Sequence, residues 1–151
     1  MTDQNAATDN RLDDTRMPSS ADQLDRLIST PDDRVITELN TMPGDFIVLG
    51  AGGKMGLHLC QMLRQALSQL GRQDQVFAVS RFSADQATDR FIASDILTIA
   101  ADLSDPAAYS RLPDARNVFF LAGVKFGTSS SPDLLERMNV QTPRLAASHF
   151  R

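Results

Sequence analysis

Apolar residues recur along the chain with two different periods, and these periods alternate from Asp45 onward. Short continuous apolar runs, typical of buried strands, lie at 46–50, 75–80, 95–100 and 117–123. The segment 54–70 carries apolar residues at the spacing of one helix face, and Gly71 beyond it is suited to a helix C-terminus. Weaker helical patterns lie at 84–92 and 105–112.

The last apolar pattern, at 131–150, predicts a long helix with Ser131 as its N-cap and Pro132 directly behind the cap. Pro143 lies inside this pattern and is expected to kink the helix or split it in two. Strands that alternate with helices favour right-handed crossovers and a parallel sheet, and continuous apolar strands suit a sheet covered on both faces. The predicted fold class is therefore α/β, a Rossmann-like parallel sheet of about four strands in the order 3-2-1-4, flanked by helices.

The N-terminal part of the chain has a different pattern. Residues 1–19 are polar and are predicted to be disordered. Residues 20–42 predict two short helices docked on the domain, the first capped by Ser20 and the second by Thr30 with Pro31 at its first position. A partly helical acidic tail is the alternative. The predicted organisation is a tail, two short helices and a domain, at 1–19, 20–42 and 43–151.

Composition restricts the class of protein. The chain has 151 residues and a formal net charge of −4, and residues 1–42 hold nine acidic residues against four arginines. No basic stripe is present, so nucleic-acid binding is not expected. No apolar run approaches the roughly 20 residues of a membrane span, and no signal-peptide pattern is visible. The single Cys60 excludes an intrachain disulfide and indicates a reducing compartment, so a cytoplasmic location is predicted.

His58, His149 and Cys60 are isolated candidates for chemistry. Neither histidine has cysteines or carboxylates at ligand spacing in the sequence, so no metal site is predicted. Cys60 lies within the predicted helix 54–70 and is interpreted as a packed small residue rather than a reactive thiol.

The first predicted strand leads directly into the glycine-rich stretch VLGAGGKMG. Its glycines Gly50, Gly53 and Gly56 have the spacing GxxGxxG. Between a strand and a helix, glycines permit a tight turn, close approach of the backbone to a pyrophosphate, and close packing of helix on strand. A P-loop is excluded because Lys54 is followed by Met55 instead of Ser or Thr. The stretch predicts dinucleotide binding, and a glycine-rich turn without a ligand is the alternative.

The end of the second predicted strand indicates which dinucleotide is bound. An acidic residue there would accept from the ribose 2′-hydroxyl of NAD, but this chain has Ser80 and Arg81. A hydroxyl and a guanidinium suit a 2′-phosphate, and Lys54 could add charge nearby. NADP is therefore predicted in preference to NAD. The alternative is that Arg81 is simply a solvated residue at a strand end.

The ends of the third and fourth predicted strands add further candidates. Asp102 and Leu103 follow the third strand, where a carboxylate could accept from the adenine amino group; alternatively, Asp102 caps the next turn. Ala122 and Gly123 close the fourth strand, and their small size would permit backbone contact with the cofactor.

The loop after the fourth predicted strand offers candidates for substrate binding. Lys125 and Thr128 lie in the stretch VKFGTSSS, at the carboxyl end of the sheet where such folds bind ligands. They could bind a carboxylate or phosphate of a substrate, and a mobile polar loop is the alternative.

Five stretches together resemble the NAD(P)-dependent epimerase/dehydratase family of extended short-chain dehydrogenases/reductases. They are GAGGKMG at 50–56, AVSRFS at 78–83, ADL at 101–103, VFFLAG at 118–123 and MNVQTP at 138–143. The resemblance covers about residues 45–150. It implies a Rossmann-type fold, a nicotinamide cofactor, a sugar-nucleotide or similar carbonyl or alcohol substrate, and pairing of two copies through helices.

The resemblance also implies a role for each matching residue. The glycine stretch, with Gly50, Gly53, Lys54, Met55 and Gly56, would wrap the pyrophosphate. The residues expected at the ribose, the adenine and along the cofactor are Ser80, Arg81, Asp102, Leu103, Ala122 and Gly123. Asn139 matches the asparagine that the family places on the helix after the fourth strand.

The chain departs from the family at the catalytic pair, a tyrosine followed four residues later by a lysine. Its single tyrosine, Tyr109, is followed at that distance by Pro113, and its only lysines are Lys54 and Lys125. No catalytic residue is therefore assigned. We expect the N-terminal cofactor-binding part of a longer enzyme, incomplete relative to the family and inactive alone. The alternatives are a non-enzymatic NADP(H)-sensing binding module and a non-functional truncated relic.

Overall fold

The computed structural model describes residues 17–83, 87–124 and 131–151. Within them, the strands β1 (Phe46–Leu49), β2 (Val76–Ser80), β3 (Leu97–Ala100) and β4 (Asn117–Phe120) form one sheet in the order β3-β2-β1-β4. All three strand pairs are parallel. The predicted α/β class and the predicted strand order are confirmed.

The strands are in register, so their carboxyl ends meet at one edge of the sheet. Leu49 of β1 lies opposite Val79 of β2 and Phe120 of β4. The fourth strand, predicted to reach residue 123, ends at Phe120 because β1 turns away at Gly50, whose φ is +89°. The third strand starts later than predicted because Asp95, with φ +56°, still belongs to the turn that closes the preceding helix.

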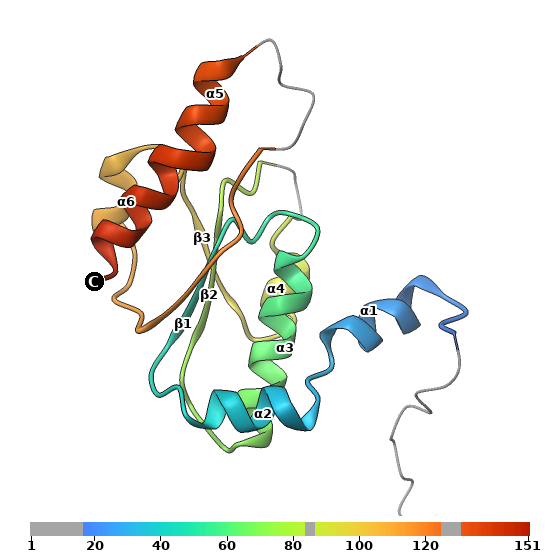
Figure 1. Ribbon diagram of the computed structural model, residues 1–151. Helices are drawn as coiled ribbons and strands as arrows, with labels where there is room; N and C mark the ends of the chain where they lie inside the picture. The colour runs from blue at the N-terminus through green and yellow to red at the C-terminus, as the bar shows by residue number, and fades with distance from the viewer. Residues whose placement is uncertain (1–16, 84–86, 125–130) are drawn as a thin grey trace, which may run out of the picture.

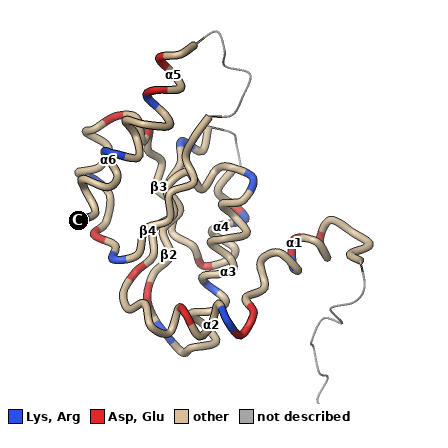
Figure 2. The backbone as a smooth tube through the Cα atoms, viewed as in Figure 1, with Lys and Arg blue, Asp and Glu red and all other residues tan. Residues whose placement is uncertain are grey.

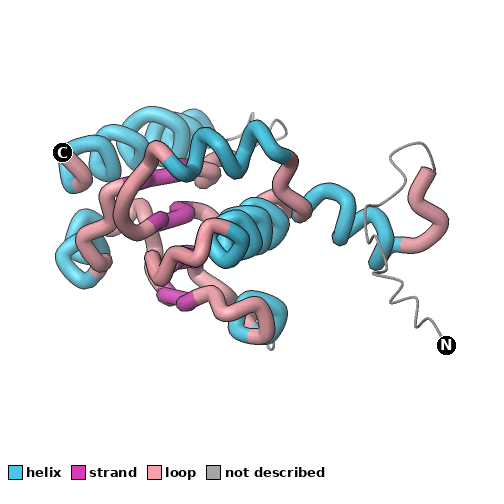
Figure 3. The backbone as a smooth tube through the Cα atoms, turned by 90° about the horizontal axis from the view of Figure 1, so that it is seen from below, coloured by secondary structure: helices cyan, strands magenta, loops and turns pink. Residues whose placement is uncertain are grey.

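Helices cover both faces of the sheet, which forms the middle layer in Figure 3. One face is covered by α2 (Asp33–Asn40), α3 (Gly56–Gln69) and the short α4 (Asp89–Ile92). The other is covered by the 3-10 helix η1 (Pro106–Arg111) and α6 (Thr142–His149). The strands point alternate side chains into these two cores, which explains the continuous apolar runs of the sequence. None of the described helices is both long and apolar enough to cross a bilayer.

The C-terminal helical pattern is not split in two at Pro143; instead, its geometry changes just before this proline. It consists of α5 (Pro132–Glu136), a π-helical turn η2 (Arg137–Gln141) and α6. The Thr142 hydroxyl donates to the Arg137 carbonyl at 2.9 Å across this wide turn. Proline lacks an N–H and crowds the carbonyl one turn earlier, and a π turn accommodates both defects without ending the helix. Ser131 occupies the N-cap position, but its side chain makes no capping hydrogen bond.

Two helices precede the sheet. In α1 (Ala21–Ser29) the Ser20 side chain accepts from the Gln23 N–H at 3.2 Å, so the predicted cap is confirmed. In α2 the predicted cap is wrong: Asp32 accepts from the Val35 N–H at 2.8 Å. Thr30 is instead the C-cap residue of α1, where its hydroxyl donates to the Arg26 carbonyl, and α2 begins only after Asp32.

The helices α1 and α2 are attached to the molecule in different ways. In α2, Leu39 is buried, and Val35 and Ile36 pack against the core under α3. In α1, Leu24, Leu27 and Ile28 remain 41–45% exposed, and Ser29 is the buried residue. Figures 1 and 3 both place α1 on the far side of α3 from the sheet.

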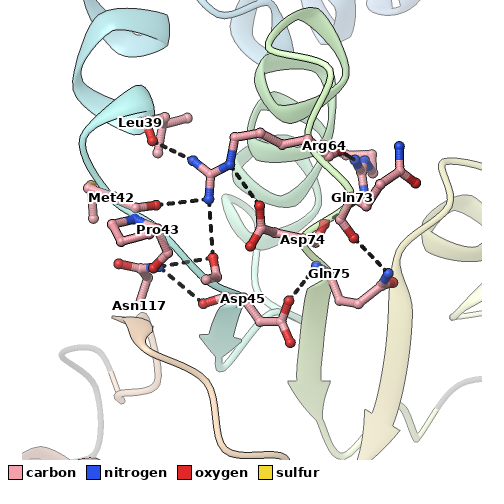
Figure 4. A network of polar contacts seen from close by, with 11 residues as sticks. Leu39, Met42, Pro43, Asp45, Arg64, Gln73, Asp74, Gln75 and Asn117 are labelled. Carbon is pink, nitrogen blue, oxygen red and sulfur yellow. Dashed lines mark hydrogen bonds and ion pairs between the residues drawn. The ribbon is translucent and has the colours of Figure 1, made fainter.

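A polar network holds the amino end of the sheet together (Figure 4). The Arg72 guanidinium donates to the carbonyls of Leu39 at 2.6 Å and Met42 at 3.0 Å, and to the Asp74 carboxylate at 2.7 Å. Its hydrogen bond is the main reason why the pKa of Asp74 is lowered. Arg72 follows Gly71, which ends α3 as predicted with φ +65°. The network therefore fixes the end of α3 against the entry to β1.

Candidate functional site

A cavity of about 810 Å³ opens at the carboxyl end of the sheet. Its wall combines the turn after β1 with residues that follow β2, β3 and β4, and α5 with the π turn forms one further side. Most of the site residues predicted from the sequence line it: Gly50, Gly53, Lys54, Ser80, Arg81, Asp102, Leu103, Ala122 and Gly123. Met55, Gly56 and Asn139 do not line it. The volume is in the range of pockets that hold small molecules and cofactors.

Two of the glycines after β1 are required by the fold itself. A Cβ at Gly50 would lie 2.4 Å from the backbone nitrogen of Ala122, and the residue has φ +89°. A Cβ at Gly56 would lie 2.1 Å from the carbonyl oxygen of Ala51. The first glycine lets the turn after β1 pass close to the end of β4, and the second lets α3 start directly on that turn. These contacts account for Gly50 and Gly56 without any ligand.

Gly53 is different, because the fold does not require a glycine there. A Cβ at this position would have one neighbour, the Gly50 carbonyl oxygen at 3.5 Å, which is an ordinary contact. Its φ lies outside the left-handed range. Gly53 nevertheless lines the cavity and is exposed. A missing side chain at such a place leaves the backbone accessible to a bound molecule.

The start of α3 faces the same cavity. Leu57 and His58 of its first turn line the wall, and among the described residues no acceptor is hydrogen bonded to their backbone N–H groups. Met55 occupies the N-cap position without a capping side-chain hydrogen bond, and its side chain is 72% exposed. Free N–H groups at a helix start, together with the helix dipole, favour an anion.

Basic side chains come to the cavity from several elements, and Figure 2 shows basic segments at this upper, carboxyl end of the sheet. Lys54 lies in the glycine turn, Arg81 follows β2, and Arg137 begins the π turn. Within the described part of the chain, these three side chains donate no hydrogen bond and have no carboxylate within ion-pair distance. The cavity is therefore suited to a ligand with negative charge.

Asp102 is the acidic side chain at the cavity beyond β3. Its Oδ1 accepts from the Ser104 N–H at 2.9 Å and from the Ser104 hydroxyl at 2.8 Å. These hydrogen bonds, with smaller contributions from Arg81 and Arg137, lower the pKa of Asp102. Asp102 therefore caps the turn after β3, which was the alternative to adenine binding. Asp105 caps the 3-10 helix η1 by accepting from the Ala107 N–H.

The end of β4 is held by Asn139 from the π turn. Asn139 Oδ1 accepts from the Val124 N–H at 3.1 Å, and its Nδ2 donates to the Val124 carbonyl at 3.3 Å. A Cβ at Gly123 would lie 3.2 Å from Asn139 Oδ1, so the small residue lets the two segments approach. Asn139 therefore supports the wall of the cavity from behind. The predicted substrate residues Lys125 and Thr128 lie outside the described residues.

Several lining residues were missed by the sequence analysis, above all His58 and Arg90. His58 was interpreted as isolated, but its Nε2 donates to the Asp25 carboxylate of α1 at 2.9 Å. Arg90, on α4, donates to the same carboxylate at 2.6 Å. No local pattern could reveal this cluster, because its members come from three helices that only the tertiary fold brings together.

Tyr109 and Cys60 belong to the cores. The Tyr109 hydroxyl donates to the Leu103 carbonyl at 3.0 Å, and burial raises the pKa of this tyrosine. Burial also raises the pKa of the Cys60 thiol to about 12, so it is a packed residue and not a reactive thiolate. Among the described residues, no group of His, Cys, Asp and Glu side chains is arranged to hold a metal ion.

Comparison with known protein families, with curated proteins and with solved structures finds no match for this chain. What the fold itself establishes is an α/β architecture with a Rossmann-like parallel sheet, an arrangement compatible with nucleotide binding.

Proposed function

We propose that the chain binds a nicotinamide dinucleotide, with NADP preferred to NAD, in the cavity at the carboxyl end of the sheet. The observation that carries this proposal is Gly53: it lines the cavity and its lack of a side chain serves no contact within the fold. A pyrophosphate lying over Gly53 and extending toward the start of α3 would explain why this position has no side chain. There it would accept from backbone N–H groups and lie in the field of the helix dipole.

The preference for NADP rests on the wall beyond β2. Ser80 and Arg81 line the cavity there, at the place where a Rossmann-type site contacts the adenosine ribose. A guanidinium binds a 2′-phosphate through charge-assisted hydrogen bonds, whereas NAD offers a neutral hydroxyl at that point. Asp102, on the neighbouring strand end, is ionised and engaged with Ser104. Arg81 is therefore proposed as the residue that distinguishes the two dinucleotides.

The test is a titration of the purified chain with NADPH and NADH, followed by nicotinamide fluorescence, for the natural sequence and for Gly53→Ala. We expect Gly53→Ala to weaken NADPH binding by about tenfold or more, because the methyl group holds the phosphate off the backbone. The thermal unfolding midpoint should stay unchanged, since the new Cβ makes only the ordinary contact with Gly50. Equal NADPH affinity of the two proteins would contradict the proposed pyrophosphate position.

We further propose that this binding serves an epimerase/dehydratase-type oxidoreductase that acts on a sugar nucleotide or a similar carbonyl or alcohol substrate. The motifs that resemble this family support the assignment. The single tyrosine of the chain, Tyr109, is buried and hydrogen bonded within the fold, so it is not placed for proton transfer. The chain alone should bind NADPH without transferring its hydride. Oxidation of NADPH by the isolated chain in the presence of a carbonyl substrate would contradict this expectation.

A second candidate function is a cofactor-sensing module, and one observation favours it. The N-terminal helix α1 contacts two residues of the cavity wall through Asp25, which offers a route from a bound ligand to this helix. Reversible NADPH binding without turnover is common to both candidates. Absence of NADPH and NADH binding by a folded chain would leave only the interpretation as a non-functional relic.

A further inference from the structure

Asp25 of α1 is bound to two side chains of the cavity wall. Its Oδ1 accepts from His58 Nε2 at 2.9 Å, and its Oδ2 accepts from an Arg90 Nη at 2.6 Å. The second nitrogen of the His58 ring lies 3.3 Å from the Lys54 carbonyl oxygen in the glycine turn. A carboxylate from the N-terminal helix therefore binds two side chains that line the cavity proposed to hold the dinucleotide.

The side-chain hydrogen bonds that attach α1 come from this carboxylate, while Ser29 of the same helix is buried. Among the described residues, every side-chain hydrogen bond from α1 to another element runs through Asp25. No α1 residue belongs to either hydrophobic core, whereas α2 contributes Leu39 to one of them. An element that contributes no side chain to a core is expected to have a lower free energy of local release than one that does.

We propose that α1 is an electrostatic gate of the cavity: Asp25 holds His58 and Arg90, and an anionic dinucleotide displaces Asp25 when it binds. The gate rests on the proposed function, because its ligand is the phosphate-bearing molecule assigned to this cavity. A phosphate near the start of α3 and the Asp25 carboxylate repel one another and compete for the same donors. By linkage, binding of the dinucleotide releases α1, and release of α1 strengthens binding.

The first experiment measures NADPH affinity for the natural chain and for Asp25→Ala, with Asp22→Ala as the matched control. Asp22 lies on the same helix and its replacement changes the net charge equally, while it makes no contact with His58 or Arg90. Asp25→Ala should bind NADPH tighter by about fivefold or more, and Asp22→Ala should bind like the natural chain. Affinity of Asp25→Ala that is equal to or weaker than that of the natural chain would overturn the gate.

The second experiment follows hydrogen exchange of the α1 amides in the natural chain with and without saturating NADPH. Exchange across Ala21–Ser29 should become faster with NADPH, while exchange across Asp33–Asn40 of α2 should not. Unchanged or slower exchange of α1 in the complex would overturn displacement, even if Asp25→Ala binds more tightly. Inorganic pyrophosphate serves as the probe that has phosphates but no nicotinamide.

A double-mutant cycle tests whether the competition runs through Arg90. In an Arg90→Gln background, Asp25→Ala should gain less affinity than in the natural background, because one of the contested groups is absent. An undiminished gain would overturn the role of Arg90.

The outcomes separate the gate from the proposed function. Binding of NADPH by the natural chain with no gain in Asp25→Ala refutes the gate and leaves the proposed function standing. Binding by Asp25→Ala alone supports both. Failure of both proteins to bind NADPH and pyrophosphate refutes both.

Discussion

The two ends of the sheet use similar polar residues for different purposes. At the amino end, the Arg72 guanidinium donates to the Asp74 carboxylate and to backbone carbonyls. The Asn117 side-chain amide nitrogen lies 3.2 Å from the carbonyl oxygens of Pro43, Gly44 and Asp45. At the carboxyl end, Lys54 and Arg81 face a cavity. A basic residue enclosed by acceptors stabilises the fold, whereas basic residues around a hollow indicate a ligand.

The difference follows from the architecture. In a parallel sheet, all strands begin at one edge and end at the opposite edge. At the edge where they end, the loops leave in opposite directions from the point where the strand order reverses, which opens a crevice there. Here that point lies between β1 and β4, where Gly50 and Ala122 come together. The amino end is closed by α2 and the end of α3, so its polar groups bind one another (Figure 4).

The largest effect should come from Gly50→Ala, which damages the fold at the carboxyl end of the sheet, beside the cavity. The new Cβ would overlap the Ala122 backbone at 2.4 Å, and alanine is strained at φ +89°. Destabilisation of about 3 kcal/mol or more is expected. Urea unfolding followed by circular dichroism measures it, with Gly53→Ala as the matched control. A Gly50→Ala protein as stable as the control would show that the turn adjusts freely.

Arg72→Ala should destabilise the chain by about 2–4 kcal/mol, because the Leu39 and Met42 carbonyls and the Asp74 carboxylate lose their donor. Arg111→Ala, at an exposed position of η1, is the control and should change stability little. The folded fraction of Arg72→Ala should keep its NADPH affinity. Loss of NADPH binding without loss of stability would contradict the view that Arg72, at the amino end of the sheet, stabilises the fold and takes no part in binding.

Arg81→Asp is expected to change cofactor binding without changing stability. It should weaken NADPH binding by about tenfold or more and NADH binding much less, since only NADPH carries the 2′-phosphate. Stability should stay within about 0.5 kcal/mol of the natural chain, as at other exposed sites. Arg111→Asp controls for the change in net charge. Tighter NADPH binding by Arg81→Asp would contradict the role assigned to this residue.

The smallest effect should appear in the pH dependence of stability. The hydrogen bond from Arg72 lowers the folded-state pKa of Asp74 below the ordinary value of 3.8. A lowered carboxyl pKa contributes stability that is fully present above the unfolded pKa and is lost as the pH falls through the folded pKa. Between pH 5 and about pH 2, the natural chain should therefore lose more stability than Asp74→Asn in urea unfolding. An equal loss would show that Asp74 contributes no pH-dependent stability.

Much of the fold could be predicted because short stretches of sequence determine its strands and helix ends. The strands at 46–50 and 75–80 stand out as apolar runs, and Gly71 marks the end of α3. Errors arose where two residues could do the same local task. Thr30 and Asp32 are both suitable helix caps, and the choice depended on Thr30 being used at the end of α1.

The candidate site was predicted in part, for a related reason. The glycine turn and the residues after each strand could be found because the carboxyl ends of parallel strands converge. His58, Arg90 and Arg137 were missed since they lie on helices whose rotation and packing decide which side chains face the cavity. The contact of His58 with Asp25 joins residues 33 positions apart, and no spacing in the sequence encodes it.

The residue pattern alone was enough to predict the alternation of strands and helices, the parallel sheet and the position of the glycine turn. These features follow from periodicity and from the conformational freedom of glycine. Only the packed fold showed that steric contacts require Gly50 and Gly56 but not Gly53. It also showed that Asp25 reaches the cavity wall. Both depend on steric and polar contacts between segments far apart in the chain, which exist only after the helices have packed on the sheet.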